Sequence, residues 1–272
     1  MKSAKQISLI FSFALLLILT ACTKKEEAEI AGFQLSTLES SKKNDKDLKF
    51  TYGHPVNLRS GGVARSWVAK DQSGKPVALG VELPEKAIFN LKDEPIVFTI
   101  ELPKDAGVSP FEQITLDWNP HGHEPDHVFT LPHFDLHFYA ISEQERLKIP
   151  LILPPSMDLA PADKYLPVAY VLGPGVVPAM GAHWVDVLSP EFNGGTFTKT
   201  FIYGSYNGNI TFFEPMFTVD YLKKKTIESI PIRQPQAFRV NGYYPQSYSF
   251  SYEKSGKVFN IALTDLTYRK GE

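Results

Sequence analysis

Alternating polar and apolar residues mark the middle of the chain as strand-forming. In the segment His133–Tyr139, every second residue is a large apolar one, and His133, Asp135 and His137 occupy the positions between them. Successive side chains of a β-strand point to opposite faces, so these three polar side chains share one face. The apolar face can then enter a core, and the polar face presents a row of metal-ligand-type groups.

Further runs rich in Val, Ile, Thr, Phe and Tyr predict more strands, separated by short turn sequences. The predicted strands lie at residues 66–69, 76–81, 95–102, 114–118, 197–206, 210–219, 248–252 and 258–263. Turns are expected at residues 72–75, 207–208 and 254–257. Of these, Asn207-Gly208 is the strongest hairpin signal, because both central residues of a type I′ turn need a positive φ.

Helical signals are few and short. The sequence Ser142-Glu143-Gln144-Glu145 is a capping-box pattern and predicts a helix through Leu147, and residues 219–229 predict one or two further turns. The prolines between Pro150 and Pro178 predict an extended connection rather than the interior of a sheet. The expected fold is therefore all-β, a mainly antiparallel sandwich or barrel with one or two short helices, in a single domain over residues 49–272.

The N-terminus predicts export. Lys2 and Lys5 precede an apolar run over residues 7–20, too short for a comfortable membrane span and suited to a signal peptide. The run ends in Leu19-Thr20-Ala21-Cys22, which resembles the lipobox of bacterial lipoproteins. This resemblance implies that residues 1–21 are a signal peptide and that Cys22 carries lipid. The alternative is an ordinary secretory signal with a chance cysteine.

The predicted location is the bacterial cell envelope, with the membrane as a partner through the lipid on Cys22. Thr23 follows the cysteine, so no aspartate signals retention at an inner membrane, and a diderm host would carry the protein on its outer membrane. Residues 22–48 are rich in charged and small polar residues and predict a flexible tether. A formal net charge of −2 gives no indication of a nucleic-acid partner.

Histidine is concentrated in one part of the sequence. Five of the seven histidines fall between Trp118 and Tyr139. Because Cys22 is the only cysteine, a metal site in the folded domain must be built from His, Asp, Glu and water. We expect His121 and His123 to share one face of a strand. His133 and His137 are about 13 Å apart on a regular strand, which makes it unfavourable for both to bind one ion.

The leading hypothesis is a mononuclear divalent-metal site, with zinc favoured and copper as an alternative. The expected ligands are His123 and His183, then His137, His133 and Glu214, with Asp135, Glu124 and His121 in supporting positions. Met180 and Met216 lie near these residues in the sequence and are the faint indication of copper, although packing is the better interpretation of both. His127 is expected in a turn. A hydrogen-bonded, metal-free histidine face is the competing interpretation.

Several motifs resemble a bacterial family of secreted proteins and lipoproteins filed as a domain of unknown function. They are residues 118–125, 132–139, 180–186, 201–206 and 213–216. The resemblance covers roughly residues 50 to 225 and implies one domain that contains these motifs. It brings no activity to transfer.

Three functional classes follow. The first is a lipid-anchored metal-binding protein, which could be a carrier, a sensor or part of an envelope assembly. The second is an envelope enzyme in which a metal ion with an open coordination position activates water. The third is a structural lipoprotein without metal, with a homo-oligomer or an envelope protein as partner. Metal content and the coordination shell discriminate among them.

Overall fold

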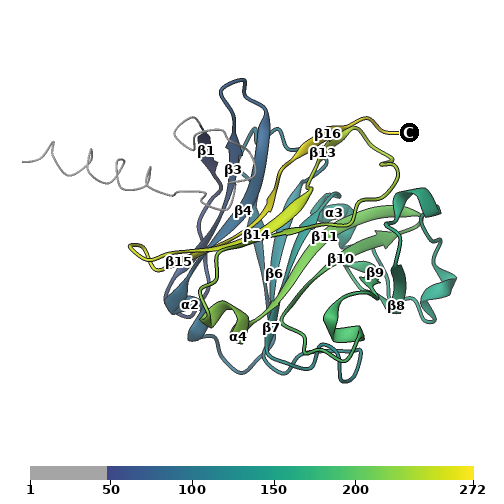
Figure 1. The fold of residues 1–272 in the computed structure, drawn as a ribbon, viewed down its shortest axis with the longest axis horizontal. Coiled ribbons are helices and arrows are strands. Elements are labelled where there is room, and N and C mark those ends of the chain that lie inside the picture. The colour runs from purple at the N-terminus through teal and green to yellow at the C-terminus, as the bar shows by residue number, and fades with distance from the viewer. Residues whose placement is uncertain (1–47) are drawn as a thin grey trace, which may run out of the picture. The chain divides into compact units, whose positions relative to one another are not determined.

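The computed structural model describes residues 48–272 (Figure 1). The predicted signal peptide, Cys22 and the tether up to residue 47 lie outside the described residues. Within the described part, every helix is too short or too polar to cross a membrane.

Two seven-stranded antiparallel sheets form the fold. The first sheet contains β1 (Lys49–Tyr52), β2 (Val56–Asn57), β3 (Val63–Lys70), β4 (Pro76–Pro84), β12 (Glu228–Pro231), β14 (Ser247–Glu253) and β15 (Val258–Thr264). The second contains β5 (Ile96–Glu101), β6 (Gln113–Asn119), β7 (His133–Tyr139), β8 (Tyr170–Val177), β9 (Gly181–Asp186), β10 (Lys199–Tyr206) and β11 (Asn209–Thr218). A small ribbon pairs β13 (Gly242–Tyr244) with β16 (Thr267–Arg269).

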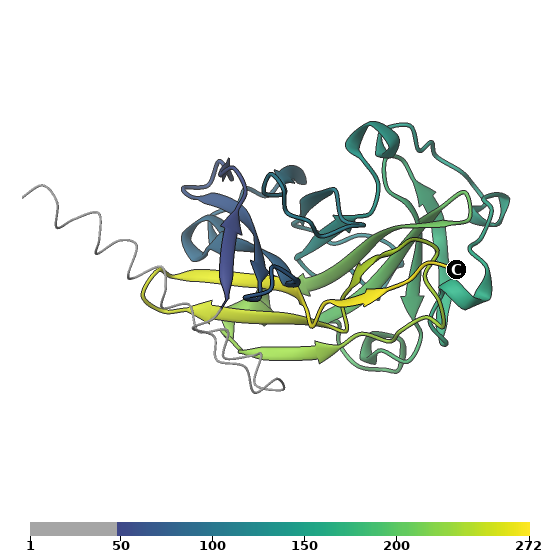
Figure 2. The ribbon, with the colours of Figure 1, turned by 90° about the horizontal axis from the view of Figure 1, so that it is seen from above.

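Short helices join the strands. They are α2 (Glu85–Phe89), α3 (Glu143–Arg146) and α4 (Val219–Lys223), with 3₁₀ turns η2 (Pro155–Met157), η3 (Asp163–Tyr165) and η4 (Pro190–Phe192). The order along the first sheet is β1-β3-β4-β15-β14-β12, with β2 beside β3, so strands from both ends of the described chain lie side by side (Figure 2). The order along the second sheet is β5-β6-β7-β11-β10-β9-β8. The predicted all-β class is confirmed as a sandwich of two open sheets rather than a closed barrel.

The main core lies between the sheets. From β7, Phe134, Leu136 and Phe138 enter it, as the alternating pattern predicts, and they pack in one cluster with residues such as Leu79 and Ile261 of the first sheet. All five side chains are fully buried. Burying a side chain of this size contributes about 1.5–3 kcal/mol, so the apolar face of β7 holds the second sheet in place.

The opposite face of the second sheet is also covered. A smaller cluster packs on it from β7, β9, β10, β11 and the loops around them; its buried members are Phe129, Tyr139, Val185, Phe197, Ile202, Phe212 and Met216. This face is called the outer face below. Because apolar side chains and loops cover it, the polar residues of β7 on this face are buried instead of solvated, and each needs a partner.

The local predictions mostly hold. Asn207 and Gly208 have φ of 48° and 74° and join β10 to β11, as a type I′ hairpin requires. Ser142 caps α3 through a capping box with Glu145, and α4 begins where a helix is expected. The proline-rich connection contains a strand, β8, which occupies the edge of the sheet where proline is tolerated. Helix α2 has no counterpart among the sequence-based expectations.

Candidate metal centre

The polar row of β7 lies on the outer face and is buried. His133, Asp135 and His137 are 0%, 5% and 1% exposed. In the register of the sheet, Asp135 pairs with Asp117 of β6 on one side and with Met216 of β11 on the other. The row therefore has chemically different neighbours on its two sides. Its residues belong to two separate groups of possible metal ligands.

The first group is His137, Glu214 and His183, from β7, β11 and β9, and is called the buried triad. Nε2 of His137 lies 3.5 Å from Oε1 of Glu214, and Nε2 of His183 lies 3.9 Å from Oε2 of the same carboxyl group. The three side chains each offer one ligand atom within 4.8 Å of the other two. Three strands that are not consecutive in the sequence thus bring two imidazoles and one carboxyl group to one point.

These distances fit ligands around an ion better than hydrogen bonds. An N–H···O bond spans about 2.7–3.2 Å, whereas two ligands bound tetrahedrally at about 2.0–2.1 Å lie about 3.3–3.4 Å apart. His137 Nε2 and Glu214 Oε2 are buried and have no hydrogen-bond partner among the described residues. Such an unpartnered buried group costs about 1–3 kcal/mol, so the donor set fits a bound cation.

A glycine on β10 makes room for this arrangement. His183 pairs in register with Gly204, and a Cβ on Gly204 would lie 2.0 Å from Cε1 of Phe212. The Phe212 ring instead lies against Gly204, with its centroid 4.9 Å from that of His137 and 5.0 Å from that of His183. Phe212 therefore supports both imidazoles and helps to set their orientation.

The second group is His123, His133 and Asp135, called the outer triad. Nε2 of His123 lies 3.2 Å from Oδ2 of Asp135, and Nε2 of His133 lies 3.1 Å from Oδ1. His123 comes from the loop after β6, which folds back so that the His123 amide donates to the Phe129 carbonyl at 2.9 Å. Gly122 permits this turn: its φ is 70°, and a Cβ would lie 2.2 Å from the Phe129 oxygen.

In three of the triad histidines, Nδ1 lies next to an oxygen atom, so Nε2 is the nitrogen that can bind an ion. Nδ1 of His133 lies 2.7 Å from the Leu131 carbonyl oxygen, and Nδ1 of His123 lies 2.6 Å from the Glu124 carbonyl oxygen. Nδ1 of His137 lies 3.3 Å from Thr115 Oγ1. A carbonyl oxygen only accepts, so in His133 and His123 the proton is assigned to Nδ1 and the Nε2 lone pair faces the triad.

Asp117 and Asn119 of β6 lie beside the triads and line the same pocket. Oδ2 of Asp117 is 3.8 Å from Nδ1 of His137, beyond hydrogen-bond distance but close enough for its charge to act on that ring. The Asn119 amide donates to Oδ2 of Asp135 at 2.7 Å and fixes that carboxylate. Asn119 thus holds a ligand side chain in place, and Asp117 places a carboxyl group beside another.

Burial controls the ionisation of the buried triad and of Asp117. It lowers the pKa of His137 to about 3 and that of His183 to about 4, so both imidazoles are neutral at neutral pH, as metal ligands must be. Burial, with the nearby Asp135 and Asp117 charges, raises the pKa of Glu214 well above its usual range. Burial, followed by the Asp135 charge, raises the pKa of Asp117 to about 7.

The outer triad has the opposite electrostatic character. Burial disfavours an ionised Asp135, but the imidazoles of His123 and His133 that face its carboxylate outweigh this effect and hold the pKa of Asp135 well below its usual range. Burial likewise disfavours a charged His123, yet the hydrogen bond and charge of Asp135 raise the pKa of His123. The outer triad is therefore a place where positive charge is stabilised.

Both triads open onto one pocket of about 550 Å³. From the triads, His123, Asp135, His137 and His183 line it, and Asp117 reaches it between them. The rest of its wall is largely apolar and includes Leu151, Leu153, Val176, Val177, Pro178 and Met180. An ion in either triad would have coordination positions facing this space.

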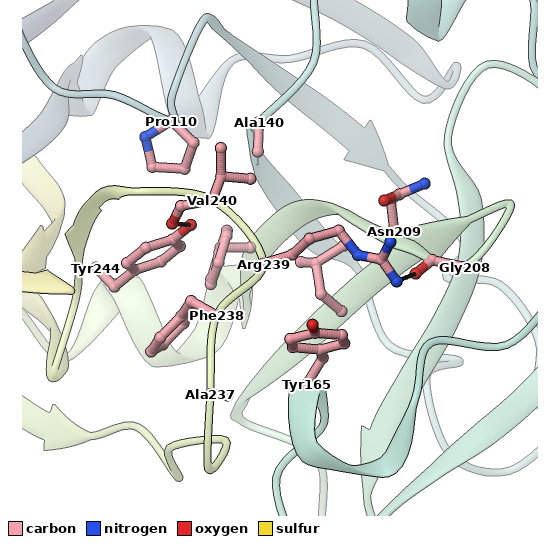
Figure 3. A pocket seen from close by; sticks show the side chains of 12 residues that line it. Pro110, Ala140, Tyr165, Gly208, Asn209, Ala237, Phe238, Arg239, Val240 and Tyr244 are labelled. Carbon is pink, nitrogen blue, oxygen red and sulfur yellow. Dashed lines mark hydrogen bonds between the residues drawn. The ribbon is translucent and has the colours of Figure 1, made fainter. Parts of the chain in front are cut away.

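A separate recess shown in Figure 3 has a different character. It encloses about 50 Å³ and is lined by residues such as Tyr165, Phe238 and Tyr244. Its one guanidinium group, from Arg239, donates to the Gly208 carbonyl oxygen at 3.3 Å. The recess has room for a few water molecules at most and shares no residue with the triads.

The structure brings together five of the predicted metal ligands but groups them differently. His123 and His183, expected to act together, belong to different triads, and Asp135, expected in a supporting position, offers a ligand atom. His133 and His137 fall in separate groups, as their spacing predicts. Glu214 is 1% exposed and does not point to solvent.

The expected strand carrying His121 and His123 is wrong. Strand β6 ends at Asn119, and both histidines lie in the following loop. His121 is 68% exposed and 3.5 Å from Asp93, away from the triads. Glu124 contributes its backbone carbonyl rather than its side chain. His127 lies in a turn with a φ of 67°, as expected.

Asp117 is the residue that sequence reasoning missed. It is one acid within a predicted strand, Ile114-Thr115-Leu116-Asp117-Trp118, and its alternation with apolar residues was the available signal. Met216 packs in the outer-face cluster, which agrees with its expected packing role, and Trp118 packs in the main core.

Compared with protein families, with curated proteins and with solved structures, the chain shows no match in any of the three. The resemblance to a family of unknown function therefore stays a prediction.

Proposed function

We propose that this protein binds a divalent transition-metal ion in the buried triad. The observation that carries the proposal is the unpartnered state, among the described residues, of His137 Nε2 and Glu214 Oε2 deep in the second sheet. Two neutral imidazoles and one carboxylate are a common ligand set for such ions. A bound ion would partner both atoms.

Zinc is the ion that we propose. Its bonds to imidazole nitrogen and carboxylate oxygen measure about 2.0–2.2 Å, and the N···O distances in the buried triad are within about half an ångström of the corresponding tetrahedral edge. The residue types favour zinc over copper, because the sulfur of Met216 is packed in the apolar cluster of the outer face. Met180 lines the pocket and keeps copper as the alternative.

Metal content tests the proposal. Full-length wild type and His183→Ala are purified without a histidine tag and equilibrated with zinc. The variant should bind about one equivalent of zinc less than wild type. The matched control is His127→Ala, which removes a turn histidine outside the triads and should leave the metal content unchanged. Equal metal content in His183→Ala and wild type would overturn the proposal. Circular dichroism of both variants verifies that the fold is retained.

The pocket supports a second candidate function, a metal-dependent enzyme that activates water. Three protein ligands leave a fourth zinc position open, and His137 and His183 both border the 550 Å³ pocket. In that role the ion would lower the pKa of a bound water molecule, and the apolar wall would hold part of a substrate. A shell closed by a fourth protein ligand in the zinc-loaded protein would favour a carrier or structural role over an enzyme.

We propose the cell envelope as the location, with a lipid on Cys22 as the anchor. The support is the sequence alone: a basic start, a short apolar run and a lipobox-like Leu19–Cys22. Labelling of expressing cells with a radioactive fatty acid should mark wild type but not Cys22→Ala. Labelling of both chains, or of neither, would contradict the anchor.

A further inference from the structure

We infer that the outer triad is a second divalent-metal site, so that the pocket accommodates two ions. The two triads use different side chains, and their β7 members, His133 and His137, are about 13 Å apart along a regular strand. One ion therefore does not serve both groups. The inference goes beyond the proposed function, because the outer triad is complete without any residue of the buried one.

The contact between His133 and Asp135 calls for a cation. Nδ1 of His133 donates to the Leu131 carbonyl oxygen, so a neutral ring turns its Nε2 lone pair toward Asp135. Nε2 lies 3.1 Å from Oδ1 of Asp135, but the two atoms lack hydrogen-bond geometry and are unpartnered within residues 48–272. Two electron pairs that face one another at this distance repel, and a metal ion between them converts the repulsion into two bonds.

His123 repeats the pattern at the other oxygen of the same carboxylate. Its Nδ1 lies 2.6 Å from the Glu124 carbonyl oxygen, and its Nε2 lies 3.2 Å from Oδ2 of Asp135. A neutral imidazole carries one proton and can satisfy only one of these acceptors. Both nitrogen atoms of the ring have a favourable partner only if the ring takes up a second proton or if Nε2 binds a metal ion.

The arrangement as a whole favours the ion over the second proton. The rings of His123 and His133 meet edge to face with centroids 4.7 Å apart, and both direct Nε2 at one carboxylate. Two protonated rings at this separation would repel, whereas two neutral rings and one carboxylate are a nitrogen and oxygen donor set that suits a divalent transition-metal cation. Asn119 already holds the carboxylate in position.

Access to the outer triad is direct. The His123 side chain is 40% exposed and lines the pocket, whereas His133 is fully buried beneath it. An ion can therefore enter from the pocket and replace the contact between Nε2 of His123 and Oδ2 of Asp135. We assign a divalent ion with nitrogen and oxygen preference, such as zinc or cobalt, to this site.

Metal stoichiometry tests the inference. The full-length, tag-free chain is titrated with zinc and, separately, with cobalt, and bound metal is counted after gel filtration. Wild type should bind two equivalents, His123→Ala one, His183→Ala one and the double variant none. His121→Ala is the matched control from the same loop and should bind two. Because His123 is in an exposed loop, its variant should keep the wild-type circular dichroism spectrum.

The outcomes separate this inference from the proposed function. One equivalent in both wild type and His123→Ala overturns the second site and leaves the buried site standing. One equivalent in wild type that is lost in His123→Ala but kept in His183→Ala supports the outer site and overturns the buried one. No metal in wild type overturns both. A variant that fails to fold is replaced by His123→Gln, which keeps a polar side chain of similar reach and should also bind one equivalent.

Discussion

Nε2 of His137 lies 3.5 Å from Oε1 of Glu214, and both side chains are almost fully buried, yet no hydrogen bond joins them. The two residues come from adjacent strands, β7 and β11, whose other faces form the main core. The sandwich thus holds a nitrogen donor and an oxygen donor at a separation typical of two ligands of one ion.

Replacing Glu214 should remove the ion from the buried triad. Glu214→Gln keeps the shape of the side chain but replaces the carboxylate with an amide, so zinc affinity should fall by roughly 100-fold or more. Replacing a residue that only supports a ligand lowers metal affinity by about 10- to 100-fold. Competition with a chromophoric chelator measures the change. The control is Glu191→Gln, because Glu191 is also buried but contacts Ser189 instead of the triads. Equal losses in the two variants would contradict the assignment.

Asp117 should tune the metal site without belonging to its ligand set. Its Oδ2 lies 3.8 Å from His137 Nδ1, so Asp117→Asn removes an ionisable carboxyl group beside that ring. The expected effect is a 10- to 100-fold loss of zinc affinity, about the size seen for such supporting carboxylates, with the number of bound ions unchanged. Asp93→Asn, which alters the exposed acid beside His121, is the control. Loss of a whole equivalent in Asp117→Asn would instead make Asp117 a ligand.

The metal-free protein should become less stable as the pH rises above about 6.5. Burial raises the pKa of Asp117 to about 7 and that of Glu214 well above its usual range. A carboxyl group with a raised folded-state pKa stabilises the fold fully below its unfolded pKa, and this stability is lost as the pH rises to the folded pKa. The loss from Asp117 is therefore complete just above pH 7, and the loss at higher pH comes from Glu214. His137 and His183, with pKa values lowered to about 3 and about 4, act in the opposite sense only below their ordinary value of 6.5.

Urea unfolding in the presence of a chelator at about pH 6.5, 7.5 and 8.5 measures this dependence. The slope should not exceed roughly 1.4 kcal/mol per pH unit for each proton released. The double variant Asp117→Asn/Glu214→Gln should give a flatter profile of stability against pH. Addition of zinc to the wild-type protein should restore the stability that it loses at high pH. A wild-type profile that is as flat as that of the double variant would contradict the role of these carboxyl groups.

The glycine beneath Phe212 should be required for both stability and metal binding. A Cβ at position 204 would lie 2.0 Å from Cε1 of Phe212, whose ring packs against His137 and His183. Gly204→Ala should destabilise the protein by about 1–3 kcal/mol or more and weaken zinc binding. In Gly175→Ala, the new Cβ meets Leu153 Cδ2 at an ordinary 3.5 Å, so this pocket-wall variant should behave as wild type. Equal stability in both variants would refute the packing argument.

The pattern within β7 shows how far sequence reasoning reaches. The alternation of His133, Asp135 and His137 with apolar residues identifies the strand, its two faces and its polar row. It also predicts that His133 and His137, four residues apart on a strand, do not bind the same ion. The pairing of β11 between β7 and β10, which brings Glu214 next to His137, depends on long-range register that periodicity does not contain.

The error at His121 and His123 has a similar cause. Two histidines at positions i and i+2 fit a strand, but Gly122 with a positive φ turns the chain into a loop instead. That loop directs His123 back to Asp135 and leaves His121 exposed near Asp93. The local sequence pattern identified histidines as candidate ligands. The turn at Gly122 determined that His123, and not His121, lies beside Asp135.

The measurement that tests the central claim most directly is anomalous diffraction at the zinc edge from crystals of the zinc-loaded protein. The account predicts a peak about 2.0–2.2 Å from Nε2 of His137, Nε2 of His183 and the carboxylate of Glu214. Zinc-loaded crystals that show no peak among these three side chains, or that show peaks only at surface residues such as His121, would contradict it.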